Sequence, residues 1–310
     1  MRMQPRRILC TTDLSEFSNQ TLAYGIGLAK AFDAKLFICH VVDLPFATIY
    51  GEVHFVPLEI QSQSLESARN QLEALMADAT VPWESLVTVG HTADEIQRLA
   101  VEHHIDLAIS ATHGRSGLKR FVLGSVTERM MRALTCPLLV IRDPALPGEG
   151  EASQAIRFGR ILVGCDFSED SDAAFRYGLS LAQEFEAELH LVHVLEPPVY
   201  TDWLKAGAVP SIDFDLNFQE QASEKLSQMV PSEARHWCSP VVSVLTGRPF
   251  AEIVAYASSR RADLIVLGMR GYGLVEALFL GSTTDRVVRH TPCPVLSVCA
   301  EGRCSIDVPG

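Results

Sequence analysis

The chain is an internal duplication, and this feature constrains its fold more than any other. The segment RRILCTTDLSE, which begins at Arg6, returns as GRILVGCDFSE from Gly159. Through the first part of each copy, matching positions are 153 residues apart. From Gly90 and Gly247 onward the offset is 157, so the second copy carries four extra residues before this point. A repeat unit of about 150 residues has the size of a domain, so we predict two domains of one fold and not a solenoid of short repeats.

Each copy alternates apolar runs with amphipathic stretches. KLFICHVV (35–42) and IDLAIS (105–110) are short, almost continuous apolar runs, typical of buried strands. SLESARNQLEALMADA (64–79) and TADEIQRLAVEHH (92–104) carry apolar residues at helical spacing. Strands that are apolar along their length and separated by helices indicate a parallel sheet covered on both faces. We therefore predict two α/β domains in tandem, each doubly wound.

The boundary between the copies lies in a segment of loop composition. RDPALPGEGEASQAIRFG (142–159) combines Pro, Gly and Glu without apolar periodicity. We therefore expect a first domain over residues 1–143, a linker over 144–158 and a second domain over 159–310.

Composition narrows the classes of partner. Of the 310 residues 38 are acidic and 26 basic, which gives a net charge of −12. Such a surface repels nucleic acid and acidic membranes. The N-terminal stretch MRMQPRRILC lacks the apolar core of a signal peptide, and no run of about 18 uncharged apolar residues is present to cross a membrane. We expect a cytoplasmic protein that binds neither nucleic acid nor membrane.

The cysteines form no CxxC pair. Their scattered positions favour reduced, mostly buried thiols. The alternative is metal or redox use of the two cysteines nearest the C-terminus. No third or fourth ligand is placed beside them, so we predict no metal site. The eight cysteines are Cys10, Cys39, Cys136, Cys165, Cys238, Cys293, Cys299 and Cys304.

A glycine-rich segment follows a buried strand in the second copy. GMRGYGLVEALFLGSTTDR begins at Gly268 with the spacing G-x2-G-x9-G-[ST], and Gly271, Gly281 and Ser282 occupy the later positions. It lies beyond the carboxyl end of a strand, where ligands bind in a doubly wound sheet. Glycine lets a ligand approach the backbone, and the N–H groups that open the next helix accept phosphate. The alternative is a connector that binds no ligand.

The first copy has the same segment with one departure. SATHGRSGLKRFVLGSVTER (110–129) places Ala111 where the first glycine belongs, followed by Gly114, Gly124 and Ser125. If this position needs a positive φ or a close approach of the ligand, a methyl group weakens the site. We therefore expect the C-terminal site to be the better binder.

These motifs stand in the order found in the universal stress protein family, which both copies strongly resemble. The match extends to GRPFAEI from Gly247 and TPCPVLSV from Thr291. The resemblance implies that each domain is a five-stranded parallel sheet of strand order 3-2-1-4-5 with flanking helices. It also implies bound ATP, with or without Mg²⁺. In this family an Asp after the first strand lies by the ribose and phosphates, and the backbone after the second-strand His recognises adenine.

The family's binding residues can be carried over position by position. Two alternatives stay open: Asp13 and Asp166 instead cap the following helices, and Arg270 contacts solvent instead of phosphate. We interpret His40 and His193 as core histidines with satisfied hydrogen bonds. The expected C-terminal site is Asp166, Val194, Gly268, Arg270, Gly271, Gly281, Ser282 and Thr283, and the expected N-terminal site is Asp13, Val41, Gly114, Gly124, Ser125 and Val126.

The resemblance implies an ATP-binding stress-response protein that acts as a switch or scaffold. We predict no catalytic residues, with slow ATP hydrolysis as the one enzymatic activity left open. Family members pair through the last strand, which implies an intramolecular pseudo-dimer of the two copies and leaves room for a homodimer. The alternative function is a scaffold that binds no nucleotide, or one that holds a small apolar ligand at the aromatic segments after the second strands.

Overall fold

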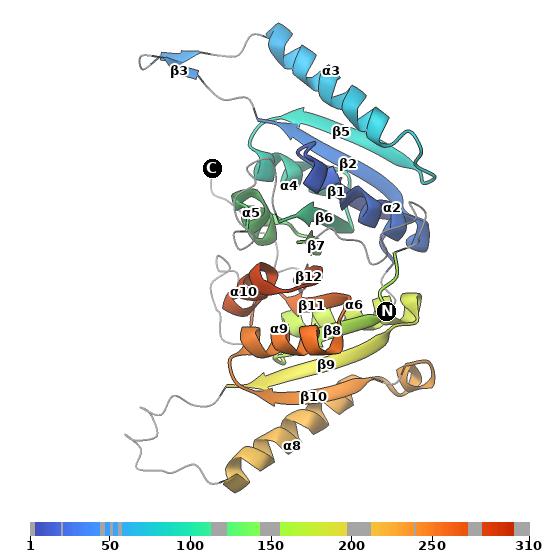
Figure 1. The fold of residues 1–310 in the computed structure, drawn as a ribbon, viewed down its shortest axis with the longest axis vertical. Coiled ribbons are helices and arrows are strands. Elements are labelled where there is room, and N and C mark those ends of the chain that lie inside the picture. Colours follow the sequence, from blue (N-terminus) through green and yellow to red (C-terminus); the bar gives the residue numbers. More distant parts are fainter. Residues whose placement is uncertain are drawn as a thin grey trace. The chain divides into compact units, whose positions relative to one another are not determined.

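The structure is a computed structural model of the chain. It divides into two compact units between Ile156 and Arg157, here called the N-terminal and C-terminal units (Figure 1). No helix of the part that the structure describes is long and apolar enough to cross a membrane. The described residues are 4–19, 21–43, 47–49, 52–54, 58–112, 123–142, 156–196, 212–238, 240–271 and 281–300.

The N-terminal unit contains a parallel sheet of strand order β5-β2-β1-β6-β7. Numbered along the chain within the unit, this is the predicted order 3-2-1-4-5. The strands of this sheet are β1 (Arg7–Thr11), β2 (Lys35–Val42), β5 (Trp83–Val89), β6 (Leu107–Ala111) and β7 (Leu138–Ile141). The helices are α1 (Glu16–Asn19), α2 (Thr21–Phe32), α3 (Leu58–Leu75), α4 (Thr92–Glu102) and α5 (Ser125–Ala133).

The C-terminal unit repeats this arrangement as β10-β9-β8-β11-β12, again parallel. Its strands are β8 (Arg160–Gly164), β9 (Glu188–Leu195), β10 (Val241–Thr246), β11 (Leu264–Gly268) and β12 (Val295–Val298). Its helices are α6 (Glu169–Phe185), α8 (Ile212–Met229), the 3-10 helix η1 (Ser232–His236), α9 (Pro249–Arg260) and α10 (Ser282–His290). The predicted fold class is therefore confirmed in both units.

The connections place helices on both faces of each sheet. In the C-terminal unit, α6 contacts β8, β11 and β12, α8 contacts β9 and β10, and α9 contacts α10. The chain runs outward from β8 to β10 and then returns to β11 and β12, so right-handed crossovers put α6 and α8 on one face and α9 and α10 on the other. The strands β8, β11 and β12 are buried along almost all of their length, which explains their continuous apolar runs.

Local sequence explains the element boundaries closely. The predicted strand 35–42 is β2 as observed. Pro249 opens α9 at its first turn, and Gly247 before it has a φ of +152°, a conformation that favours glycine. The structure adds an antiparallel pair that we did not predict, β3 (Ala47–Ile49) with β4 (Glu52–His54). It also starts α3 at Leu58, earlier than the predicted 64.

The described cysteines mostly fit the interpretation as buried thiols. Burial raises the pKa of the Cys10, Cys39 and Cys165 thiols to about 12, and all three are free. Cys299 departs from the interpretation because it is disulfide-bonded. Among the described residues, no group of three or more His, Cys, Asp or Glu side chains could hold a metal ion.

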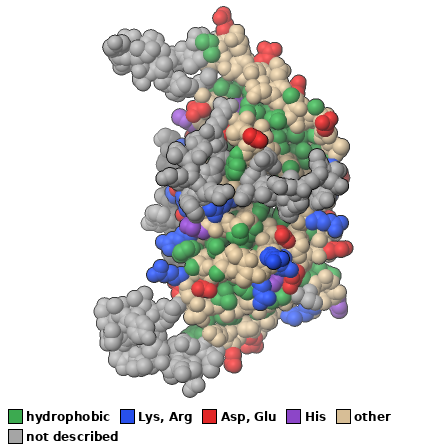
Figure 2. Space-filling model, in the orientation of Figure 1, with side chains coloured by type: hydrophobic (Ala, Val, Ile, Leu, Met, Phe, Trp, Pro, Cys, Tyr) green, Lys and Arg blue, Asp and Glu red, His purple; other side chains and the backbone are tan. Residues whose placement is uncertain are grey.

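Acidic and basic side chains both occur over the described surface drawn in Figure 2.

Candidate functional site

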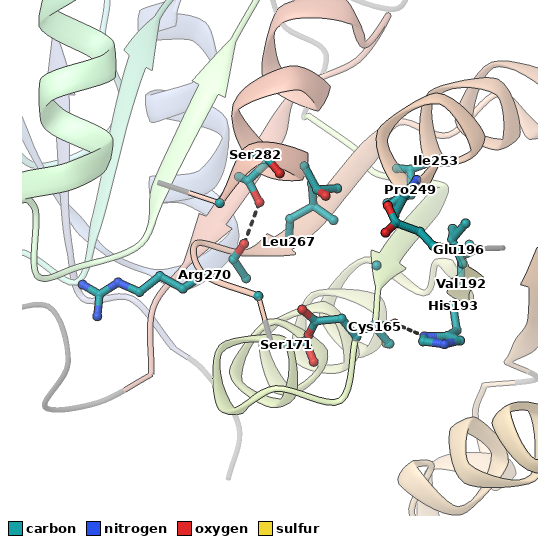
Figure 3. A pocket seen from close by; sticks show the side chains of 18 of the residues that line it. Cys165, Ser171, Val192, His193, Glu196, Pro249, Ile253, Leu267, Arg270 and Ser282 are labelled. Atoms are coloured by element: carbon teal, nitrogen blue, oxygen red, sulfur yellow. Dashed lines mark hydrogen bonds between the residues drawn. The ribbon is translucent and has the colours of Figure 1, made fainter. Parts of the chain in front are cut away.

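A cavity of about 510 Å³ opens at the carboxyl ends of β8, β9 and β11 in the C-terminal unit (Figure 3). The sheet turns back between β8 and β11, so this edge is the switch point at which doubly wound proteins bind ligands. The structure brings all eight residues predicted for the C-terminal site into the lining of this one cavity. They are Asp166, Val194, Gly268, Arg270, Gly271, Gly281, Ser282 and Thr283.

The cavity has an apolar wall and a polar wall. Pro249 and Ile253 from α9, with Val192 from β9 and Leu267 from β11, supply the apolar wall. The polar wall consists of the Asp166 carboxylate, the glycine segment and the first turn of α10. A ligand that fits both walls has a flat apolar part and a charged, hydrogen-bonding part.

The first turn of α10 is open to an anion. Its N-cap residue is Gly281, which has no side chain to cap the first turn. Asp285, the acidic residue of this turn, is engaged along the helix by Arg289, with N and O atoms 2.9 Å apart. The residues of this turn line the cavity, so its N–H groups and the positive end of the helix dipole lie where phosphate is favoured.

Asp166 does not cap the helix that follows it. Ser168 is the N-cap of α6, and its Oγ accepts a hydrogen bond from the backbone N–H of Ser171 at 3.2 Å. Asp166 Oδ1 in turn accepts from the backbone N–H of Ser168 at 3.0 Å and from its hydroxyl at 2.5 Å. A Cβ built on Gly271 would stand 2.8 Å from Asp166 Oδ2, so this glycine leaves room for the carboxylate.

From the sequence we expected glycine at position 268 to provide either a positive φ or room for a close approach of the ligand. Its φ is outside the positive range, which removes the first of these two reasons. A Cβ at Gly268 would stand 2.8 Å from the backbone carbon of Asp170 and 2.9 Å from the backbone nitrogen of Ser171. The missing side chain therefore makes room for the first turn of α6. The tight contact is with the protein's own backbone, so nothing here requires a ligand to approach Gly268.

Arg270 and His193 lie at opposite ends of the cavity. In Figure 3 the Arg270 side chain leads away from the other labelled residues, although the residue lines the cavity. His193 Nδ1 lies 2.7 Å from the backbone oxygen of Cys165, and His40 Nδ1 lies 2.9 Å from that of Thr12. Both histidines are thus hydrogen-bonded, as interpreted from the sequence, and His193 also forms part of the cavity wall.

Comparison with known proteins decides the family. The model of the universal stress protein family matches residues 5–142 and 157–298, which is most of both copies. The chain belongs to this family. A universal stress protein of Mycobacterium tuberculosis is 25% identical over 305 residues, covering 94% of this chain and 98% of that protein. One of Thermus aquaticus is 34% identical over 146 residues, which is 46% of this chain and 98% of its own length.

A solved structure has the same two-domain fold. A universal stress protein from Archaeoglobus fulgidus aligns with a TM-score of 0.69 over 97% of this chain and 100% of that one, at 24% sequence identity. This chain is thus a tandem universal stress protein, with one family domain in each unit.

The N-terminal domain of this universal stress protein keeps part of the same arrangement. The Thr127 hydroxyl donates to the Ala111 carbonyl at 2.8 Å, as the Thr284 hydroxyl does to Gly268 at 2.7 Å. Gly124 is the N-cap of α5, again without a side-chain cap. Val126 is an exposed valine where the C-terminal domain has the hydroxyl of Thr283.

The other residues predicted for the N-terminal site are only partly described. Asp13 Oδ1 accepts from the hydroxyls of Ser15 and Ser18, both at 2.6 Å, so this carboxylate also orders the start of the helix. Val41 is buried on β2, and Ser125 opens α5. Gly114 lies outside the described residues.

Asp170 was not among the residues predicted from the sequence. This side chain is 1% exposed, and its two oxygens accept backbone hydrogen bonds from Arg270 and Ala300. A signal existed, because Asp170 shares the helical spacing of Ala174, Tyr177 and Leu181 on the apolar face of α6. A charged residue on that face needs a buried partner.

Proposed function

We propose that this universal stress protein binds an adenine nucleotide, with ATP as the preferred ligand, in the C-terminal cavity. The observation that carries the proposal is the convergence of the eight residues predicted for this site on one cavity that has an apolar wall and a helix N-terminus without a side-chain cap. The chemistry of the two walls corresponds to the two ends of a nucleotide, a flat base and a chain of phosphates.

The two walls define the orientation of the nucleotide in the cavity. The base lies against Pro249 and Ile253, near the backbone of Val194 at the end of β9. The phosphates lie at the first turn of α10, where the N–H groups and hydroxyls of Ser282 and Thr283 are available. Asp166 lies between the two ends and accepts hydrogen bonds from ribose hydroxyls or contacts a Mg²⁺ ion held by the phosphates.

The surroundings favour a switch or scaffold over a catalyst. The thiol of Cys165 is a poor nucleophile, because burial raises its pKa to about 12. The ring nitrogen Nδ1 of His193 is engaged by the Cys165 carbonyl. Oδ1 of Asp166 is engaged by the hydroxyl and the backbone of Ser168. These groups hold the cavity in shape, so we expect ATP turnover to be slow or absent.

The first test identifies the ligand. The purified protein is denatured, released nucleotides are separated by chromatography, and ATP binding to nucleotide-free protein is then measured by calorimetry. We expect adenine nucleotide in the released fraction and saturable binding of ATP.

A matched pair of variants locates the site. Thr283→Val puts into the C-terminal site the residue that the N-terminal copy has at this position, and Val126→Thr makes the reverse change. We expect Thr283→Val to weaken ATP binding several-fold and Val126→Thr to leave the tighter site unchanged. Absence of any saturable nucleotide binding by folded wild-type protein would refute the proposed function and favour a scaffold without nucleotide.

A further inference from the structure

Asp170 carries a buried charge in the second position of α6. The side chain is 1% exposed. Its Oδ2 accepts from the backbone N–H of Arg270 at 3.0 Å, and its Oδ1 accepts from that of Ala300, also at 3.0 Å. The partners are 100 and 130 residues away along the chain. One carboxylate therefore joins α6 both to the glycine segment of the cavity and to the chain that follows β12.

This placement needs a reason, because a buried carboxylate is costly unless hydrogen bonds replace its water. Here the two backbone donors and the N-terminal end of the α6 dipole compensate for that cost. A simple core position would be filled at lower cost by an apolar side chain. The matching position of the first copy holds an apolar residue, Phe17. The buried carboxylate of Asp170 therefore indicates that its two hydrogen bonds have a function.

Gly268 makes the position of Asp170 possible. A Cβ on Gly268 would collide with the backbone of Asp170 and Ser171, so glycine there lets α6 come close enough for Asp170 to reach Arg270. In the first copy both positions differ together, with Ala111 for Gly268 and Phe17 for Asp170. Only the copy with the complete glycine signature has both members of the pair.

The two bonds act on the backbone that shapes the phosphate end of the cavity. Residues 269–271 run between the first turns of α6 and α10. On one side Asp170 accepts from Arg270 N–H, and on the other Gly281 N–H donates to the Met269 oxygen at 2.8 Å. Gly271, which makes room for Asp166 Oδ2, comes directly after Arg270. A shift of the Arg270 backbone would therefore move Gly271 as well. It would change both the room for the Asp166 carboxylate and the room for the phosphates.

We infer that Asp170 is the positioning residue of the C-terminal nucleotide site and that it couples nucleotide binding to the attachment of the chain at Ala300. The inference rests on the proposed function, because it describes how nucleotide binding in the same cavity is regulated. If ATP favours the conformation in which Arg270 is bonded to Asp170, it also favours the bond to Ala300, and firm attachment at Ala300 strengthens ATP binding by the same factor.

The test uses the full chain with Asp170→Asn and two controls. The Asn side chain keeps the shape but places an NH₂ group opposite one of the two N–H donors. Asp172→Asn removes an exposed charge from the same helical turn. Leu181→Ala truncates a buried side chain of α6 away from the cavity. It lowers stability without touching the site, and so it controls for a general loss of stability.

Two quantities are measured in each protein: the Kd of ATP by calorimetry, and amide hydrogen exchange at Arg270 and Ala300 with and without ATP. For Asp170→Asn we expect a Kd raised by roughly tenfold or more, the size of a lost hydrogen bond to a charged group. We expect faster exchange at both amides in this variant. In wild type, ATP should slow exchange at Ala300, and Asp170→Asn should abolish that effect. Both controls should bind ATP as wild type does.

The outcomes separate the inference from the proposed function. If wild type binds no nucleotide, the proposed function fails, and with it the coupling. If wild type binds ATP but Asp170→Asn binds it equally well, the positioning role is wrong. If ATP leaves exchange at Ala300 unchanged in wild type, the coupling is wrong, and this result needs no variant to fold. If Leu181→Ala weakens binding as much as Asp170→Asn, the effect is general loss of stability and the inference is overturned.

Discussion

Replacing Gly268 with alanine tests whether this glycine serves the protein's own packing. The added Cβ would stand 2.8 Å from the backbone carbon of Asp170 and 2.9 Å from the backbone nitrogen of Ser171. Backbone atoms inside a helix cannot move aside as a flexible side-chain end can, so α6 or β11 must shift. Overpacking of this kind costs about 1–3 kcal/mol. For a domain of this size we expect the melting temperature to fall by roughly 3–10 °C.

The informative comparison is Gly271→Ala. Among the residues that the structure describes, its Cβ would meet Asp166 Oδ2, at 2.8 Å, which is the end of a side chain. We expect this variant to melt within about 2 °C of wild type, because the carboxylate can rotate away, while ATP affinity falls roughly tenfold. Gly268→Ala should lower both stability and affinity. Scanning calorimetry and titration calorimetry on the three proteins provide both quantities.

The result that would refute this reasoning is specific. If Gly268→Ala loses ATP affinity without any loss of melting temperature, the glycine provides room for the ligand, as we first expected from the sequence, and its contact with α6 is incidental. If neither quantity changes, the close approach of α6 to β11 is not present in the protein.

Three further predictions follow from single side chains. Asp166→Asn should weaken ATP binding roughly tenfold with a native circular dichroism spectrum, and unchanged affinity would limit Asp166 to ordering Ser168. Cys10, Cys39 and Cys165 should resist alkylation at pH 8 until the protein is denatured, since burial raises each pKa to about 12, and mass spectrometry showing rapid labelling of any of them would contradict this. Burial lowers the pKa of His190, so its neutral form is favoured in the folded state. Stability should therefore hold above about pH 6.5 and fall as the pH drops below it. His190→Gln should flatten that part of the unfolding profile, and an identical slope in urea titrations would contradict the assignment.

The fold could be predicted because its signals are local and repeated. The run 35–42 is almost continuously apolar and contains β-branched residues, and it forms β2 over the same residues. The duplication then supplies the same pattern twice, at constant offsets, so an error in one copy can be checked against the other. The glycine spacing predicted that Gly271, Gly281 and Ser282 contribute to one ligand site, and the structure brings all three into the lining of one cavity.

What the sequence did not reveal depends on distances between elements. The spacing identified Gly268 but could not say whether its missing side chain faces a ligand or a helix, because that depends on how α6 crosses β11. Asp170 was missed for the same reason: its partners, Arg270 and Ala300, are far away in the chain. Asp166 was expected either to bind nucleotide or to cap a helix, and only the structure shows that Ser168 is the cap.

Photoaffinity labelling with an azido-substituted ATP, followed by mass mapping of the labelled peptides, tests the central claim most directly. The account predicts label that unmodified ATP competes away, located on the apolar wall of the C-terminal cavity in peptides that contain Val194 or Pro249. Label that ATP does not compete, or competed label only on peptides outside this cavity, would contradict it.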